Sequence, residues 1–276
     1  MDAVLKGTLP TMLMRIAPLA VSFAVATTPI LAAPLAAHRA VYEITLGDAS
    51  DRSGVKGVRG RLVYDFDGTE CDGYTVNFRF VTRIQLERDV RVTDQQMTTF
   101  EDVGETMFRF VTRSFTDEQP DREVNGTASG ADDGVEVELE GRDEPVELSS
   151  AVFPTQHLLD LIEAARNGDT VHEARVFDGS EDGDRALDTT AVFGSPERGG
   201  EGKDALPAEF ADLTYWPVSI AYYTTGDQSG EALPVYRIEM KLYENGVTRD
   251  IAMDYGEFRL EGELSEIELR EVGDCD

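Results

Sequence analysis

Residues 74–80 read YTVNFRF, and this stretch predicts the fold class because its apolar and polar side chains alternate. The residues of one parity are all apolar: Tyr74, Val76, Phe78 and Phe80. A period of two residues is typical of a strand with one buried face and one face toward solvent. The chain therefore contains at least one half-buried strand.

The same alternation recurs along the chain and predicts further strands at His38–Leu46, Val58–Phe66, Met107–Phe115, Val135–Leu139, Val171–Phe177, Leu187–Phe193, Val218–Tyr223, Val235–Tyr243, Val247–Met253 and Phe258–Leu269. In the last of these runs the apolar parity changes near Ser265, which predicts a bulge or a break between two strands. Segments rich in turn-forming residues separate the runs: DGTECDGY (67–74), NGTASGADDG (125–134), TTGDQSGEALP (224–234) and ENG (244–246). We therefore expect an all-β, antiparallel barrel or sandwich.

One helix interrupts this pattern, in the segment FPTQHLLDLIEAARNG at residues 153–168. Pro154 suits a first helical position, and Asn167-Gly168 suits the end of a helix. The apolar side chains form one stripe: Leu158, Leu159, Leu161, Ile162 and Ala165. Such a stripe predicts that the helix packs on a sheet face or closes an opening of a barrel. Residues 195–213 are expected to form a surface loop.

The N-terminal residues have the pattern of a secretory signal peptide. Lys6 and Arg15 precede the uncharged apolar run Ile16–Leu31, and small residues follow it. Cleavage is expected near Ala32 or at Ala37. The alternative, a transmembrane anchor, fits less well because two prolines interrupt a run shorter than about twenty apolar residues. We expect a signal peptide at 1–37, a single domain at 38–276 and a periplasmic location.

The chain is strongly acidic, with 54 acidic and 25 basic residues. Removal of residues 1–37 leaves 23 basic and 53 acidic residues, a net charge of −30. This charge argues against partners such as nucleic acid or anionic lipid. Adaptation to a saline medium explains it better than a specific cationic ligand, because salt screens the repulsion between carboxylates.

An outer-membrane barrel is the rival interpretation of an exported β-protein. The lipid-facing positions of such a barrel carry no charge, whereas strands such as EVELEG (136–141) and ELSEIEL (263–269) carry many carboxylates. We therefore expect a protein that does not span the membrane.

The residues that could carry catalysis are few. The three histidines, His38, His157 and His172, lie far apart in the sequence. His157 together with Asp160 and the serines at 149–150 could form a Ser-His-Asp arrangement, but local hydrogen bonding explains a histidine at a helix start better. No other catalytic motif is present, so we expect a protein that is not an enzyme and has no cofactor.

Residues 178–184, DGSEDGD, resemble the first half of a calcium-binding loop, with oxygen ligands at Asp178, Ser180 and Asp182. The twelfth position of such a loop requires a glutamate, and here it is Thr189. The flanking runs also read as strands rather than helices. We therefore interpret this segment as a turn between two strands and expect no metal site.

Five longer blocks, in order, resemble the EipB cell-envelope-integrity family of alphaproteobacteria: AHRAVYEITL, FPTQHLLDLIEAA, VFDGSEDGDRALDTTAVFG, YWPVSIAYY and ENGVTRDIAMDYGEFRLEGEL. The resemblance extends from Ala37 to about Leu269. It implies a periplasmic protein folded as an open, spiral-like antiparallel β-barrel with a helix packed into it. It also implies a role in maintaining the envelope under stress, and it supplies no catalytic residues.

The family has one early and one C-terminal cysteine, which Cys71 and Cys275 match. Two cysteines in an exported chain form an even set in an oxidising compartment, so a disulfide between them is expected. The alternatives are two free thiols or a disulfide between two chains.

Two classes of function remain. The first is a non-enzymatic protein that binds periplasmic envelope proteins, among them a repeat-containing partner. The second is a carrier or sensor whose barrel interior holds a lipid or a lipoprotein acyl chain. A large apolar cavity would favour the carrier, and an interior filled by side chains would favour the interaction protein.

Overall fold

The computed structural model describes residues 35–131, 134–199, 206–225 and 233–271. The strands within these ranges are β1 (His38–Ala49), β2 (Val55–Thr69), β3 (Gly73–Leu86), β4 (Val90–Asp102), β5 (Met107–Thr116), β6 (Gln119–Ala131), β7 (Gly134–Leu139), β8 (Val146–Leu148), β9 (Val171–Val176), β10 (Leu187–Phe193), β11 (Glu197–Arg198), β12 (Thr214–Thr224), β13 (Tyr236–Tyr243), β14 (Thr248–Asp254) and β15 (Phe258–Leu269). The helices are α1 (Pro154–Asn167) and the short 3₁₀ helix η1 (Ala208–Ala211).

The strands form one open antiparallel sheet. Its order is β8-β7-β6-β5-β4-β3-β2-β1-β15-β14-β13-β12-β10-β9, and β11 pairs with β12 beside this path. Pairing of β1 with β15 joins the first strand to the last, so two runs of neighbouring hairpins meet at the middle of the sheet. The expected open antiparallel fold with one helix is confirmed.

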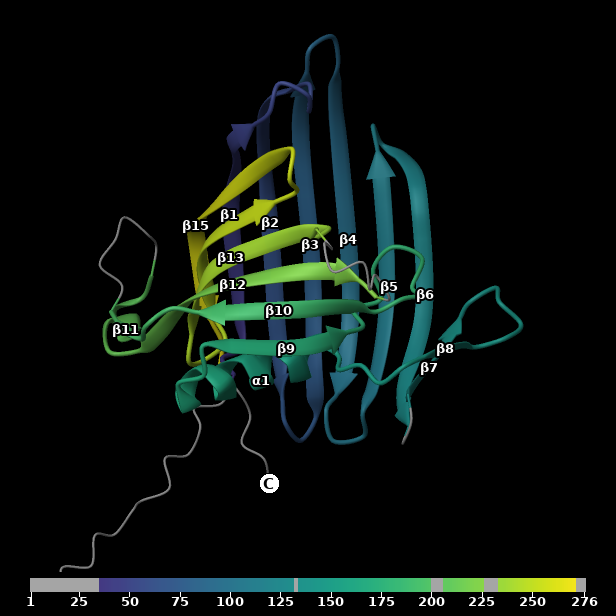
Figure 1. Ribbon diagram of the computed structural model, residues 1–276, viewed down its shortest axis with the longest axis vertical. Coiled ribbons are helices and arrows are strands. Elements are labelled where there is room, and N and C mark those ends of the chain that lie inside the picture. The colour runs from purple at the N-terminus through teal and green to yellow at the C-terminus, as the bar shows by residue number, and fades with distance from the viewer. Residues whose placement is uncertain (1–34, 132–133, 200–205, 226–232, 272–276) are drawn as a thin grey trace, which may run out of the picture. The chain divides into compact units, whose positions relative to one another are not determined.

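The sheet curls so that its two runs share a core. Phe66 on β2 and Tyr74 on β3 belong to the same buried cluster as Val218 and Ile220 on β12. Figure 1 shows the same arrangement, with β9, β10, β12 and β13 crossing in front of the longer strands β2–β4. We call the side of the sheet that faces this core the inner face and the opposite side the outer face.

Helix α1 packs against the inner face, as its apolar stripe predicts. It begins at Pro154 and ends at Asn167, and Gly168 adopts the left-handed conformation with φ 81°. Leu161 and Ile162 are buried in the core shared by β2, β3 and β12. None of the helices in the described ranges has the length and apolar character that a membrane crossing requires.

The parity change near Ser265 is a β-bulge within a single strand. Val41 pairs with Glu266 while Tyr42 pairs with Leu264, so Ser265 is the extra residue. Its hydroxyl donates a hydrogen bond to the carbonyl of Val41 at 3.0 Å. The bulge allows both halves of β15 to turn their apolar side chains toward a buried surface.

Two expectations about irregular segments were wrong in part. Most of the predicted turn NGTASGADDG belongs to β6, because β5 and β7 supply hydrogen-bonding partners on both sides of it. The predicted surface loop at 195–213 contains β11 and η1, and its Phe210 is fully buried, while residues 200–205 lie outside the described residues. Phe210 packs edge-on against Tyr243 on the outer face of β13, with 5.0 Å between the ring centroids.

The residues just before β1 also belong to the folded unit. Leu35 is 4% exposed and Ala37 is 0% exposed. The N–H of Ala36 donates to the carbonyl of Asn245, and the carbonyl of Ala37 accepts from the N–H of Arg270. These contacts lie upstream of the expected domain start at His38.

Candidate functional site

The histidine, serine and aspartate that could form a triad do not come together. His157 is 5% exposed, and its Nε2 lies 3.5 Å from the hydroxyl of Thr189. Asp160 instead accepts a hydrogen bond from Gln156, and the hydroxyl of Ser149 accepts one from Arg175. Burial, and to a smaller extent the neighbouring His172, lower the pKa of His157 to about 4. His157 is therefore neutral near pH 7 and packs as a core side chain.

His38 is also a buried structural residue. Its Nδ1 lies 2.7 Å from the carbonyl oxygen of Ala36, and its ring packs beside those of Tyr64 and Phe66. Burial lowers the pKa of His38. Like that of His157, the ring of His38 is buried and packs against other side chains of the core.

The DGSEDGD segment lies within the ten-residue connection between β9 and β10 (177–186), which packs against β5 near the other end of the sheet. A side chain at Gly179 would meet the ring of Phe110 on β5 at 2.5 Å, so only glycine permits this approach. Arg122 on β6 lies 3.5 Å from Asp182, and Arg142 lies 3.1 Å from Asp184. Asp182 and Asp184 therefore pair with arginines, whereas the carboxylate of Asp178 accepts a hydrogen bond from the N–H of Ser180 at 2.9 Å. No group of three possible metal ligands occurs in the described ranges.

Cys71 lies in the exposed turn between β2 and β3. Cys275 lies outside the described residues, so the disulfide between the two cysteines stays a prediction.

The interior beneath the helix is filled by side chains. Trp216, Leu242 and Leu161 are packed together in the shared core. A hollow beside Leu35, His38 and Leu158 has a volume of only about 10 Å³. A second hollow on the inner face, about 210 Å³ between β3–β6 and the DGSEDGD segment, is bordered largely by polar side chains.

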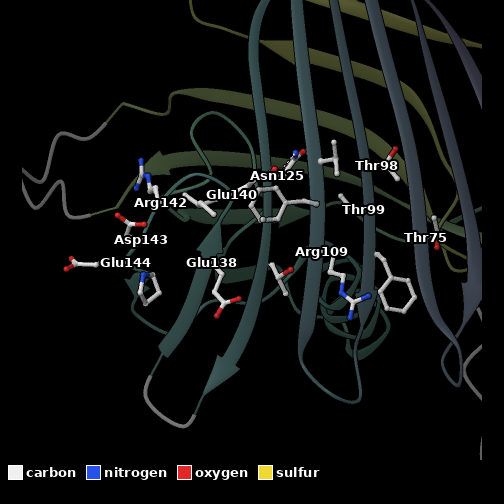
Figure 2. Close-up of a pocket in the computed structure, with 17 residues that line it drawn as sticks. Thr75, Thr98, Thr99, Arg109, Asn125, Glu138, Glu140, Arg142, Asp143 and Glu144 are labelled. Atoms are coloured by element: carbon white, nitrogen blue, oxygen red, sulfur yellow. Dashed lines mark hydrogen bonds between the residues drawn. The ribbon is translucent and has the colours of Figure 1, made fainter.

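A larger groove of about 700 Å³ lies over the outer face of β3–β7 (Figure 2). Its floor is a row of directly paired residues, one from each strand: Thr75, Phe100, Arg109, Thr127 and Glu138. Paired residues on neighbouring strands point to the same face, so the sheet register itself aligns this row. With strands about 4.8 Å apart, a five-strand row is roughly 19 Å long.

The connection between β7 and β8 forms one wall of the groove and adds charge. Figure 2 shows Arg142, Asp143 and Glu144 on this wall, beyond Glu138 and Glu140. Arg142 is paired with Asp184, and the amide of Asn125 donates a 2.6 Å hydrogen bond to Glu140. These contacts hold the wall in place.

The groove therefore offers hydroxyl groups, the aromatic side chains of Phe100 and Phe110, and charges of both signs. Such a set suits recognition of a polypeptide segment, whose backbone and side chains both need polar partners. Arg109 could be predicted to face outward, because it alternates with Phe108 and Phe110. Phe100 and Thr127 could not, because β4 and β6 show no apolar alternation.

Comparisons with known proteins agree with the fold and with the predicted resemblance. The model of the EipB-like family matches residues 30–271. The cell envelope integrity protein EipB of Brucella abortus strain 2308 is 42% identical over 253 residues, which cover 91% of this chain and 90% of the relative. A crystal structure titled as a beta-barrel-like protein of the domain of unknown function DUF1849, from Brucella abortus, superposes with a TM-score of 0.82 and 42% identity. That match covers 87% of this chain and 100% of the other. Because the family model and the relative both extend over most of the sequence, the chain belongs to the EipB-like family.

Proposed function

We propose that this protein helps to maintain the integrity of the cell envelope as a non-enzymatic periplasmic protein that binds other proteins. The envelope role rests on the relative from Brucella abortus, which bears the name cell envelope integrity protein. The periplasmic location rests on the signal-peptide pattern at the N-terminus.

The main support for a binding role is the position of the largest hollow described above, which lies on the outer face of the sheet. The core beneath α1 is filled, whereas the 700 Å³ groove lies on the outer face. A carrier of acyl chains would need an apolar cavity inside the sheet, and a protein that recognises other proteins needs an accessible polar and aromatic surface. The groove between β3 and β7 is therefore the surface that we assign to a partner.

A blocking substitution tests this assignment. Deletion of the gene in its host should increase sensitivity to detergent, and the wild-type gene should restore resistance. Thr127→Trp places an indole in the middle of the groove floor and should fail to restore it. Thr190→Trp is the matched control, since Thr190 is a half-buried outer-face residue on β10 that does not line the groove.

Each outcome has a separate meaning. A deletion strain with normal detergent resistance contradicts the envelope role. Full rescue by Thr127→Trp, in a strain that needs the gene, contradicts the use of the groove. Lipid extracted in equimolar amount from protein purified out of the periplasm would favour the carrier instead.

A further inference from the structure

Four arginines gather on the outer face of β2 and β3: Arg59, Arg61, Arg79 and Arg83, here called the arginine patch. Arg59 pairs directly with Arg83 in the sheet register, and Arg61 and Arg79 lie at neighbouring positions of the same face. All four side chains are exposed. In a chain with 54 acidic and 25 basic residues, this concentration of positive charge is unexpected.

The fold neutralises only half of the patch. Arg61 forms a 2.6 Å ion pair with Glu43, and Arg79 forms a 2.8 Å ion pair with Asp94. Within the described ranges no ion pair is formed by Arg59 or Arg83, whose other strand neighbours are Thr45 and Val92. Like charges directly opposite each other destabilise a sheet. Repulsion between Arg59 and Arg83 thus destabilises the sheet, and no ion pair within the described residues compensates for it.

Apolar side chains lie among the arginines. Val63, Val81 and Val92 occupy the same face and are half-buried. Arginine around a small apolar centre is the composition of protein-binding surfaces, where arginine is enriched and other charged residues are depleted.

The arginine patch and the groove lie along one strand. The outward residues of β3 are, in order, Thr75, Asn77, Arg79, Val81 and Arg83, and the first of them lines the groove. At about 3.4 Å per residue, the distance from Thr75 to Arg83 is roughly 27 Å. An extended segment of about eight residues would cover both ends.

We propose that the arginine patch binds an acidic extended segment of a partner protein, which continues into the groove. This inference rests on the proposed function and specifies the partner's chemistry. Guanidinium groups bind carboxylates through two parallel hydrogen bonds, so Arg59 and Arg83 can each receive one carboxylate. At 0.15 M salt, repulsion between the acidic segment and the rest of the acidic surface is screened beyond about 8 Å. Binding then depends mainly on the direct contacts with the arginines.

A peptide probe tests the chemistry directly. The probe is a short fluorescent peptide in which glutamate and valine alternate, titrated into the mature protein at 0.15 M salt. The double variant Arg59→Gln/Arg83→Gln should bind it about tenfold more weakly than wild type. The control Arg113→Gln loses the same type of charge from the same face, at an arginine already paired with Glu123 at 3.0 Å, and should bind like wild type. No measurable binding by wild type, or equal weakening by the control, overturns the proposal.

A stability measurement distinguishes a binding role from a structural one. Because Arg59 and Arg83 oppose each other, Arg83→Gln should keep or raise the melting temperature at low salt. A lowered melting temperature would mean that the fold itself uses this arginine, which contradicts the proposal. If the protein sediments with phosphatidylglycerol vesicles and this depends on both arginines, the arginine patch binds lipid and the proposal is also overturned.

The rescue assay separates this inference from the proposed function. Failure of the double variant to restore detergent resistance, with rescue by Arg113→Gln, supports the inference. Full rescue by the double variant contradicts the role of the arginine patch and leaves the envelope role intact. A deletion strain without a phenotype contradicts the envelope role, while the peptide measurement still decides the binding chemistry.

Discussion

Glu101 is a buried carboxylate on β4 that holds the beginning of helix α1. It is 1% exposed, and its two oxygens accept hydrogen bonds from the N–H groups of Thr155 at 2.6 Å and Gln156 at 2.8 Å. The helix has no side-chain cap of its own, because Phe153 occupies the N-cap position. Burial raises the pKa of Glu101, and the hydrogen bonds from the helix oppose that effect. A residue from a distant strand therefore replaces the missing cap.

Glu101→Gln should lower the free energy of unfolding by roughly 1–3 kcal/mol. The amide has only one acceptor oxygen and no charge, so one N–H of the helix loses its partner inside the protein. Urea titration followed by circular dichroism measures the change. Glu105→Gln, at an exposed position in the next turn, is the control and should have little effect. Equal stability of the two variants would show that the cap is not important.

His157 should make the protein less stable in mild acid. Its pKa is 6.5 in the unfolded chain and about 4 in the fold, where burial and then His172 disfavour the charged form. Above pH 6.5 the side chain is neutral in both states. As the pH falls from 6.5 toward 4, only the unfolded chain binds the proton, so the fold loses roughly 3 kcal/mol.

Replacement of this histidine checks the prediction. His157→Gln should flatten the difference in unfolding free energy between pH 7.5 and pH 5 relative to wild type. The comparison between the two proteins cancels the titration of the many carboxylates. An unchanged slope in the variant would mean that other groups cause the pH dependence.

Helix α1 is held in place by its apolar stripe. Leu161 is 2% exposed and lies in the core between the two runs of strands. Leu161→Asp should lower the free energy of unfolding by several kcal/mol, because it leaves an unpaired charge in the core. Glu163→Asp introduces the same residue at an exposed position of the same helix and should cost well under 1 kcal/mol. If both variants melted at the same temperature, the helix would not be part of the core.

The contacts of the segment before β1 lead to a prediction about where the expected signal peptide is removed. Leu35 packs in the core and Ala36 is hydrogen-bonded to Asn245. Cleavage at Ala37 would remove these contacts, whereas cleavage near Ala32 would keep them. We therefore expect mature protein from the periplasm to begin upstream of Leu35, which intact mass and N-terminal sequencing would show. A mature chain that begins at His38 would contradict this expectation.

At the scale of the whole molecule, the end of the last strand lies beside the part of β2 that leads into the turn with Cys71. Arg270 forms hydrogen bonds to Asp65 at 2.7 and 2.9 Å and lies 3.5 Å from Asp67. The five residues from Arg270 to Cys275 can extend over about 17 Å. The tail thus starts within reach of the turn between β2 and β3.

We expect a disulfide between Cys71 and Cys275 in the exported protein. The bond would close a loop of about 200 residues, for which the chain-entropy model gives roughly 5 kcal/mol of stabilisation. Thiol labelling of the unfolded, unreduced monomer should find no free thiol, and Cys71→Ser should lower the melting temperature. Two labelled thiols would disprove the bond. An unchanged melting temperature in the variant would disprove its stabilising role.

The amino-acid sequence by itself determined the fold class and the helix. Alternation with a period of two marks β3 because half of its side chains enter the core, and a stripe with helical spacing marks α1 for the same reason. The bulge at Ser265 was also predictable, because an extra residue changes which parity is buried. All of these patterns are local, because an element that buries one face has apolar residues at the spacing of that element.

Only the tertiary structure showed that segments without apolar alternation are strands, and which residues of different strands lie next to each other. The inner face of β4 carries Gln95, Thr99 and Glu101, and β6 is mostly polar, so neither could be recognised from apolar spacing. They are strands because their neighbours supply backbone hydrogen bonds. The groove row from Thr75 to Glu138, the opposed pair of Arg59 and Arg83, and the cap by Glu101 all depend on the register between strands. Register is set by pairing across long sequence distances, and no local pattern in one strand specifies which residue of another will lie opposite it.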